Sequence, residues 1–246
     1  MPNYVTARIT LNGSEENVKK VLDFVRTEGV DKNGKEYTLL FDFNKVIPMP
    51  EELNIECGSA GDNGMKYILL KAKHSVLWER DEWDFIESME KRKAENEDDF
   101  NRMIDLGTKY LMNIAKYGCA TWYQFHNRYW QTKWNSCDAE VDGNQITFDT
   151  AWSFPAPVIE KLSELFPDVT FDFIYADEDV SSNTGRGTLC NGKYSDDTEY
   201  PDSGSNRGYE LYLEVHPEYD DQLVFVPEED TYKWIDEDED EDVPAF

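Results

Sequence analysis

Hydrophobic and polar residues alternate near the start of the chain. The alternation from Val5 to Leu11 predicts a half-buried strand, because successive side chains of a strand point to opposite faces. After Ser14, which can cap a helix, apolar residues recur at helical spacing from Val18 to Val25. A second alternation, from Tyr37 to Phe43, predicts another strand. The order strand, helix, strand predicts a small N-terminal α+β unit of βαβ type over residues 1–80.

The middle of the chain is predicted to be helical. Glycines and polar residues from Gly58 to Gly64 indicate a loop. Apolar residues at helical spacing follow from Asp81 to Tyr117 and again from Thr121 to Lys133. We therefore expect a helical segment over residues 81–134 that packs with the C-terminal domain.

The second half is predicted to form mostly strands. Two alternating segments, Cys137–Val141 and Ile146–Phe148, flank the turn signal Asp142-Gly143 and predict a hairpin. A helix is predicted next, over residues 155–166. Three further strands are predicted at Val169–Ala176, Thr188–Tyr194 and Tyr209–Val215. This order predicts an α+β domain over residues 135–227, with a mostly antiparallel sheet and helices on one face.

Charge is distributed unevenly along the chain. Its 246 residues include 52 acids and 24 lysines or arginines, a formal net charge of −28. Residues 135–246 alone contain 30 of these acids and 5 of these bases. An acidic tail is expected over residues 228–246, with an unbroken acidic run from Asp236 to Asp242. Free nucleic acid and anionic membranes repel such charge, which excludes both as direct partners.

The phase of the predicted strands indicates where the acids lie. When the apolar residues of each strand face the core, the acids between them face the other side of the sheet. We expect this face and the adjoining loops to form a field of carboxylates that resembles a nucleic-acid surface to a basic partner. Exposed aromatic residues such as Tyr212 are expected to add specificity. The predicted partner-binding residues are Asp138, Glu140, Asp149, Asp172, Asp177, Glu178, Asp179, Asp196, Asp197, Glu199, Asp202, Glu210, Tyr212 and Glu214.

A solvated sheet face is the main alternative, since antiparallel sheets commonly expose one polar face. Solvation requires polar residues of either sign, whereas these outward positions almost entirely lack lysine and arginine. The acidic run taken by itself is typical of a solubilising extension. Calcium binding has little support, because the spacing of a calcium-binding loop is absent.

Enzyme chemistry also has little support. The three histidines lie in separate segments, and no glycine-rich phosphate loop or nucleophile elbow is present. Carboxylate pairs, Asp177 with Asp179 or Asp149 with Asp172, leave a metal-dependent hydrolase as an alternative. We predict no catalytic residue, no cofactor and no metal site. The four cysteines show no close pairing and no membrane-spanning segment is evident, so we expect a cytoplasmic protein with reduced thiols.

Two tryptophan-containing segments resemble a known family. WQTKWN at Trp130–Asn135 and FDTAWSFP at Phe148–Pro155 are similar to segments of the Api-like or YubB-like proteins of phages and plasmids, and Phe43–Leu53 is similar to their N-terminal part. The chain departs from the family pattern at Gln131 and Phe154. The resemblance implies a ferredoxin-like C-terminal domain and an origin in a mobile element, with the tryptophans as determinants of the fold. It implies no reaction.

Charge and resemblance together lead to a hypothesis about function. Phage proteins meet restriction enzymes and CRISPR effector complexes, which hold nucleic acid in basic channels. The chain is therefore expected to bind and inhibit such a host complex in the bacterial cytoplasm by mimicking nucleic acid. A metal-dependent enzyme and a housekeeping protein with a solvated acidic face are the alternatives.

Overall fold

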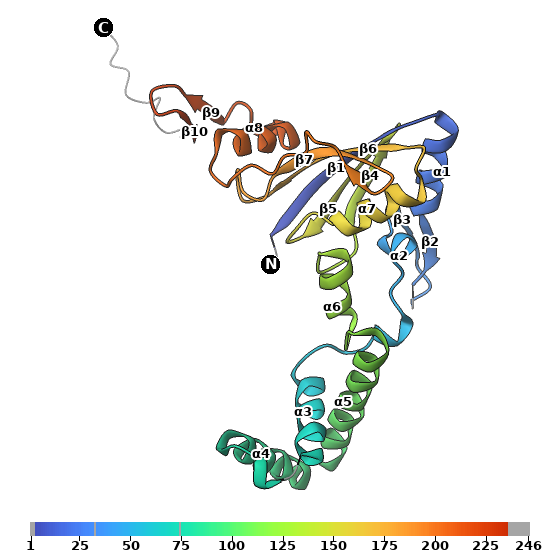
Figure 1. Cartoon of the computed structure of the whole chain (residues 1–246), viewed down its shortest axis with the longest axis vertical. Helices are drawn as coiled ribbons and strands as arrows, with labels where there is room; N and C mark the ends of the chain where they lie inside the picture. Colours follow the sequence, from blue (N-terminus) through green and yellow to red (C-terminus); the bar gives the residue numbers. More distant parts are fainter. Residues whose placement is uncertain (1–2, 32, 74, 236–246) are drawn as a thin grey trace. The chain divides into compact units, whose positions relative to one another are not determined.

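The computed structural model describes residues 3–31, 33–73 and 75–235. The chain divides into two compact units, unit 1 (residues 1–48 and 129–246) and unit 2 (residues 49–128) (Figure 1). Unit 2 is thus an insertion within the sequence of unit 1. The boundaries expected from the sequence, near residues 80 and 134, differ from this division because unit 1 is assembled from both ends of the chain.

A six-stranded antiparallel sheet forms the centre of unit 1. Its strand order is β4 (Cys137–Asp142), β5 (Gln145–Ala151), β1 (Tyr4–Asn12), β6 (Thr170–Asp177), β7 (Gly185–Cys190) and β8 (Lys193–Tyr194). The N-terminal strand β1 lies inside the sheet and pairs with β5 on one side and β6 on the other. The antiparallel α+β architecture expected from the sequence is confirmed.

The N-terminal segment completes a ferredoxin-like motif. The elements β1, α1 (Glu15–Val25), β4, β5, α7 (Ala156–Leu165) and β6 have the order βαββαβ, with residues 27–130 inserted between α1 and β4. Ser14 caps α1 by accepting a hydrogen bond from the backbone N–H of Asn17, as the sequence predicts. The expected separate N-terminal βαβ unit is therefore wrong, because β1 and α1 belong to the main sheet domain.

Two helices cover one face of this sheet. Phe24 of α1 and Phe166 at the end of α7 pack edge to face, with ring centroids 5.4 Å apart. Beneath them, β1 and β5 contribute buried side chains such as Ile9 and Phe148. We call this the inner face.

The second strand predicted near the N-terminus forms a separate hairpin. Its first half, β3 (Glu36–Leu39), pairs with β2 (Thr27–Val30) and not with β1. The rest leaves the strand: Phe41 and Phe43 are both fully buried, and Phe43 begins the short helix α2 (Phe43–Val46). Both rings pack edge to face with Phe148, so this segment fills the core where a strand was expected.

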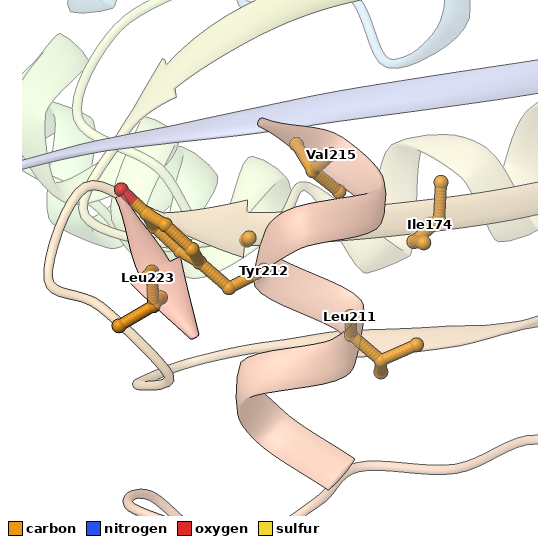
Figure 2. Close-up of a cluster of buried hydrophobic side chains, with 6 residues drawn as sticks. Ile174, Leu211, Tyr212, Val215 and Leu223 are labelled. Atoms are coloured by element: carbon orange, nitrogen blue, oxygen red, sulfur yellow. The ribbon is translucent and has the colours of Figure 1, made fainter. Parts of the chain in front are cut away.

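A helix crosses the other face of the sheet, which we call the outer face. The segment predicted as a strand at Tyr209–Val215 is the helix α8 (Asn206–Val215), capped by Ser205, whose side chain accepts from the N–H of Gly208. Figure 2 shows Leu211 and Val215 of α8 on the side of Ile174 of β6, while Tyr212 of the same buried cluster points toward Leu223. Ile174 points away from its inner-face neighbours Phe173 and Tyr175, so α8 lies opposite α7.

The outer layer continues beyond α8. A turn, η4 (Pro217–Tyr219), leads into a two-stranded hairpin of β9 (Leu223–Val226) and β10 (Thr231–Trp234). Leu223 and Tyr232 pack against the α8 cluster. The predicted start of the acidic tail, at residue 228, is therefore wrong, since residues 228–234 complete this hairpin. The run from Asp236 to Asp242 lies outside the described residues.

Unit 2 consists of helices. It contains η1 (Glu51–Leu53), α3 (Ser59–Ala72), η2 (Ser75–Leu77), α4 (Arg80–Glu95), α5 (Glu97–Tyr117) and α6 (Trp122–Phe125); a π-helical turn, η3 (His126–Trp130), then leads back into unit 1. The loop expected at Gly58–Gly64 is mostly the first turns of α3. Gly64 allows α3 to contact α5 closely, because a β-carbon there would lie 1.9 Å from the carbonyl oxygen of Met103.

The chain leaves unit 1 and returns to it at neighbouring points. The indole N–H of Trp130 donates a hydrogen bond to the carbonyl of Ile47 at 3.0 Å. Insertion between adjacent points leaves the surrounding fold intact, which is the arrangement expected of an inserted domain.

Candidate binding surface

The outer face of the sheet carries arginines as well as carboxylates. Directly opposed residues of neighbouring strands share a face. The central row, from β4 to β7, is Glu140, Thr147, Arg8, Ile174 and Arg186. Arg8 comes from β1, in the half of the chain with little net charge. The expected uniform field of carboxylates on this face is therefore wrong.

Two predicted carboxylates on the outer face are held within the sheet. Asp149 is half-buried and accepts a hydrogen bond from the hydroxyl of Thr6 at 2.7 Å. Asp172 accepts from Asn12 at 2.6 Å and from the hydroxyl of Thr188 at 2.8 Å. These groups satisfy polar neighbours on adjacent strands, which is a structural role.

Two further predicted residues are buried. Asp177 is 6% exposed and accepts from the backbone N–H of Asp179 and from the side-chain amide of Asn183, each at 3.0 Å. Tyr212 is 3% exposed and belongs to the α8 cluster. Burial raises the pKa of Tyr212 to about 12. Neither side chain is placed to contact a partner, contrary to the sequence-based expectation.

Three more predicted acids form ion pairs with the arginines of this region. Arg207 binds Glu199 and Glu210, with nitrogen–oxygen distances of 2.6 Å to each. Hydrogen bonds and charge from Arg207 hold the pKa of Glu199 below its usual value. Glu214 of α8 pairs with Arg186 at 2.9 Å. These acids are partly neutralised. The sequence did not reveal this, because Arg186 and Glu214 lie on different elements, Glu199 lies in a loop, and Arg207 and Glu210 meet only once α8 forms.

The remaining predicted acids are exposed, but they occupy several elements. They lie on the edge strand β4, in the loop after β6 and in the loop after β8, and comprise Asp138, Glu140, Glu178, Asp179, Asp196, Asp197 and Asp202. Asp138 has a positive φ of 48° at a bulge in β4. The structure thus disperses this set along the rim of the sheet.

Another acidic surface lies on the layer that covers part of the outer face. We call residues 206–235, comprising α8, η4, β9 and β10, the C-terminal acidic layer. Its two bases, Arg207 and Lys233, are already in ion pairs. Its exposed acids are Glu210, Glu214, Glu218, Asp220, Asp221, Glu228, Glu229 and Asp230. Sequence reasoning placed only two of these eight at the site. It assigned Glu228, Glu229 and Asp230 to a tail and gave Glu218, Asp220 and Asp221 no role.

An aromatic cluster brings the two tryptophan-containing segments together. The ammonium of Lys133 lies 4.5 Å from the ring centroid of Trp134 and 5.1 Å from that of Trp152. Both indoles are partly exposed, at 38% and 39%, whereas Trp130 is fully buried. The expectation that the tryptophans determine the fold thus fits the position of Trp130 alone. The two segments WQTKWN and FDTAWSFP contain these residues, so their resemblance to one family was the sequence feature that could have indicated the cluster.

The geometry separates one of the two carboxylate pairs that were considered for catalysis, Asp149 with Asp172. Asp149 opposes Thr6 and Asp172 opposes Thr10 on β1, so the two acids are offset by about 13 Å along the strand direction and cannot share one ion. Within the described ranges, no group of three or more His, Cys, Asp or Glu residues is placed to hold a metal. Burial raises the pKa of the Cys137 thiol to about 11, which keeps it protonated at neutral pH.

Replacing Asp149 by asparagine is expected to stabilise the protein at neutral pH. Burial, with the charge of Asp138, raises the pKa of Asp149 above its usual value. The ionised carboxylate therefore lowers the stability of the folded protein at pH 7, whereas below about pH 4 the carboxyl is protonated and this cost disappears. Thr6 can still donate to the amide oxygen. Asp149→Asn should raise the free energy of unfolding at pH 7 by a few tenths of a kcal/mol. Urea unfolding at pH 7 and pH 3 measures this, and a loss of stability at pH 7 contradicts it.

Comparison with known proteins identifies the domain built on this sheet. Residues 129–215 match a family model described as the ferredoxin-like domain in Api92-like protein. The crystal structure of the protein api92 from Yersinia pseudotuberculosis is similar at 13% identity and a TM-score of 0.41, over 82% of this chain and 99% of that one. No curated protein matches the chain.

The class of the protein is thus α+β with a ferredoxin-like C-terminal domain. Residues 129–215 match the ferredoxin-like domain of Api92-like proteins, which confirms the resemblance expected from the tryptophan-containing segments. No helix among the described residues is both long and apolar enough to cross a bilayer.

Proposed function

We propose that this protein of a phage or other mobile element binds and inhibits a host nucleic-acid-binding defence complex, such as a restriction enzyme or a CRISPR effector, in the bacterial cytoplasm. The acidic surface of unit 1 would occupy the basic channel that otherwise holds nucleic acid. The observation that carries the proposal is the separation of charge between the units. Unit 1 contains 37 acids and 13 bases, whereas unit 2 contains 15 and 11.

The ion pairs of unit 1 leave most of this charge uncompensated. Of the five bases after residue 134, Lys161, Arg186, Arg207 and Lys233 already pair with acids. The 30 acids of the same segment therefore far exceed what internal pairing can neutralise. Net charge of this size lowers the stability of a compact fold through self-repulsion, and a basic partner relieves that repulsion.

The structure changes which surface serves this proposal. The C-terminal acidic layer replaces the sheet face, because α8 covers part of that face and arginines occupy its central row. Its eight exposed acids lie on elements fixed to one another by the cluster around Leu211 and Leu223. Fixed like charges suit a mimic, since their spacing persists when the partner binds.

Removing three exposed acids of this layer is expected to weaken partner binding. The triple variant Asp220→Asn, Asp221→Asn, Glu228→Gln changes acids without ion-pair partners among the described residues. Association should slow several-fold and its dependence on salt should become shallower, because electrostatic steering acts mainly on the association rate. The measurement is the displacement of duplex DNA from purified host restriction and CRISPR effector complexes at low and physiological salt.

A matched control uses three exposed acids of unit 2. Asp84→Asn, Glu87→Gln, Asp105→Asn removes the same charge from the nearly neutral unit and should leave displacement unchanged. If both triple variants reduce displacement equally, the net charge of the protein is responsible for the effect, and the C-terminal acidic layer is not. If the unaltered protein displaces DNA from none of these complexes at low salt, the proposed function is wrong.

A further inference from the structure

The hairpin of β9 and β10 exposes aromatic rings within the C-terminal acidic layer. Phe225, Trp234 and Ile235 are exposed at 41%, 46% and 53%, so three large apolar side chains lie on this hairpin and the residue that follows it. Single exposed apolar residues are common on soluble proteins, whereas a group of them marks a binding surface. This group therefore points to a partner for the hairpin.

Strand pairing explains why two of these rings remain exposed. Phe225 opposes Tyr232 and Leu223 opposes Trp234, so all four side chains share the face of the hairpin that packs against α8. Leu223 and Tyr232, on one diagonal of this square, pack against the α8 cluster. Phe225 and Trp234 occupy the other diagonal, and α8 leaves them partly uncovered. The fold thus holds two rings in fixed positions while both stay accessible.

Neighbouring tyrosines support the two rings from the side. Phe225 packs on Tyr232 at a centroid distance of 5.4 Å, with the ring planes tilted by 58°. Trp234 meets Tyr219 at 5.5 Å and 85°. A neighbour at such an angle covers at most one face of a ring. Aromatic surface therefore remains for a flat group of a partner.

No cation of the chain occupies these rings. Lys233 precedes Trp234 in the strand, so its side chain points to the opposite face of the hairpin, where it pairs with Glu229 at 2.5 Å. Within residues 3–31, 33–73 and 75–235, the contacts between lysines and aromatic rings involve neither Phe225 nor Trp234. The rings are thus available to a ligand from outside the chain.

Carboxylates border the hairpin at both ends. The exposed acidic turn of residues 228–230 joins the strands at the end that carries Phe225. At the other end, the N–H of Ile235 donates to the carbonyl of Gln222 at 2.7 Å, and the exposed Asp221 adjoins this closing bond. Rings and carboxylates therefore alternate along one small, ordered element.

We propose that Phe225 and Trp234 imitate bases, and the carboxylates around them phosphates, of a single-stranded nucleic acid, so that the partner is a host protein whose basic channel binds a single strand. Such channels combine positive charge along the backbone with aromatic side chains on which bases stack. A duplex keeps the faces of its bases stacked inside, so exposed rings add nothing to a mimic of a duplex. A second copy of this chain is excluded as the partner, because the two acidic layers repel each other. This inference deepens the proposed function and rests on it.

The test loads purified host restriction and CRISPR effector complexes with labelled non-specific DNA, as a single strand in one series and as a duplex in the other. The unaltered protein should displace the single strand at a lower concentration than the duplex. Phe225→Leu and Trp234→Leu keep an apolar side chain but remove the ring. Each should weaken displacement of the single strand about fivefold or more, the contribution of one stacked base, and leave that of the duplex unchanged. The salt dependence should stay the same, because no charge is removed.

Two further variants and a stability measurement serve as controls. Trp234→Phe retains a ring and should retain most of the displacement. Trp83→Leu removes a 51% exposed tryptophan from unit 2 and should change nothing. Thermal unfolding should be the same for all four variants; where one leucine substitution destabilises the chain, the other decides. A lower unfolding temperature for both leucine variants shows a structural role for the rings and contradicts the inference.

The displacement results separate this inference from the proposed function. Displacement of both DNA forms at the same concentration, or displacement of the single strand that neither leucine substitution weakens, overturns the imitation of a single strand alone. Displacement of neither form at low salt overturns the proposed function as well.

Discussion

Removal of residues 1–48 from unit 1 is expected to abolish its folding. The deletion removes β1, whose residues pair with β5 and β6 along its whole length. It also removes Val5, Ala7, Ile9 and Leu11, each no more than 1% exposed, and leaves unpaired strand edges in the middle of the sheet. Loss of a central strand exceeds the 5–15 kcal/mol that stabilises a typical domain. Circular dichroism and urea unfolding should show no cooperative transition for residues 129–246 expressed alone.

The complementary variant tests whether unit 2 is dispensable for this fold. Replacing residues 49–128 by a short glycine-serine linker keeps β1, and the contact between Ile47 and Trp130 shows that a short connection suffices. This variant should unfold cooperatively. A peptide of residues 3–48, which supplies β1 together with the buried Phe41 and Phe43, should restore a transition to the 129–246 fragment. Cooperative unfolding of that fragment without the peptide would contradict the role given to β1.

Truncation of Trp130 is expected to be the most damaging single substitution in the tryptophan-containing segments. The indole is fully buried and packs edge to face with Phe43 at a centroid distance of 5.6 Å. It also binds the carbonyl of Ile47 where the chain leaves unit 1. Trp130→Ala should therefore lower the free energy of unfolding by about 3–5 kcal/mol, the usual cost of a large cavity.

A conservative substitution separates packing from hydrogen bonding at this position. Trp130→Phe retains an aromatic ring but leaves the Ile47 carbonyl without this donor, so we expect a smaller loss, of about 1–3 kcal/mol. Urea unfolding of both variants gives the comparison. If Trp130→Ala lowers the free energy of unfolding by less than about 1 kcal/mol, the indole does not hold together the two points at which the chain leaves unit 1 and returns to it.

Elements with a strong local signal were predicted correctly. The cap at Ser14 and the hairpin after Asp142 each depend on residues within a few positions of one another. The single strand expected at Thr188–Tyr194 is instead divided into β7 and β8 by a tight turn, with positive φ angles at Asn191 and Gly192. Such features need no tertiary information, because the chemistry that specifies them is contained in the turn itself.

The segment of α8 shows where local patterns are ambiguous. Leu211 and Val215 fit both the alternation of a strand and the spacing of a helix. Gly208 and Tyr212 complete the helical set, and Ser205 caps it. The apolar surface of β6 decides between the two, since only a helix brings Leu211, Tyr212 and Val215 into one buried cluster with Ile174. The error moved Glu210, Tyr212 and Glu214 onto the wrong element.

By itself, the amino-acid sequence determined the α+β class, the strands and helices with strong periodicity, the resemblance of the C-terminal domain to Api-like proteins and the concentration of negative charge in the second half. Tertiary structure alone decided that β1 completes the C-terminal sheet, that Arg8 and Arg186 interrupt its outer face, and that Lys133 joins Trp134 to Trp152. The physical reason is the range of the interactions. Periodicity and turn chemistry act between residues a few positions apart, whereas strand pairing and charge compensation act between segments that only the folded chain brings together.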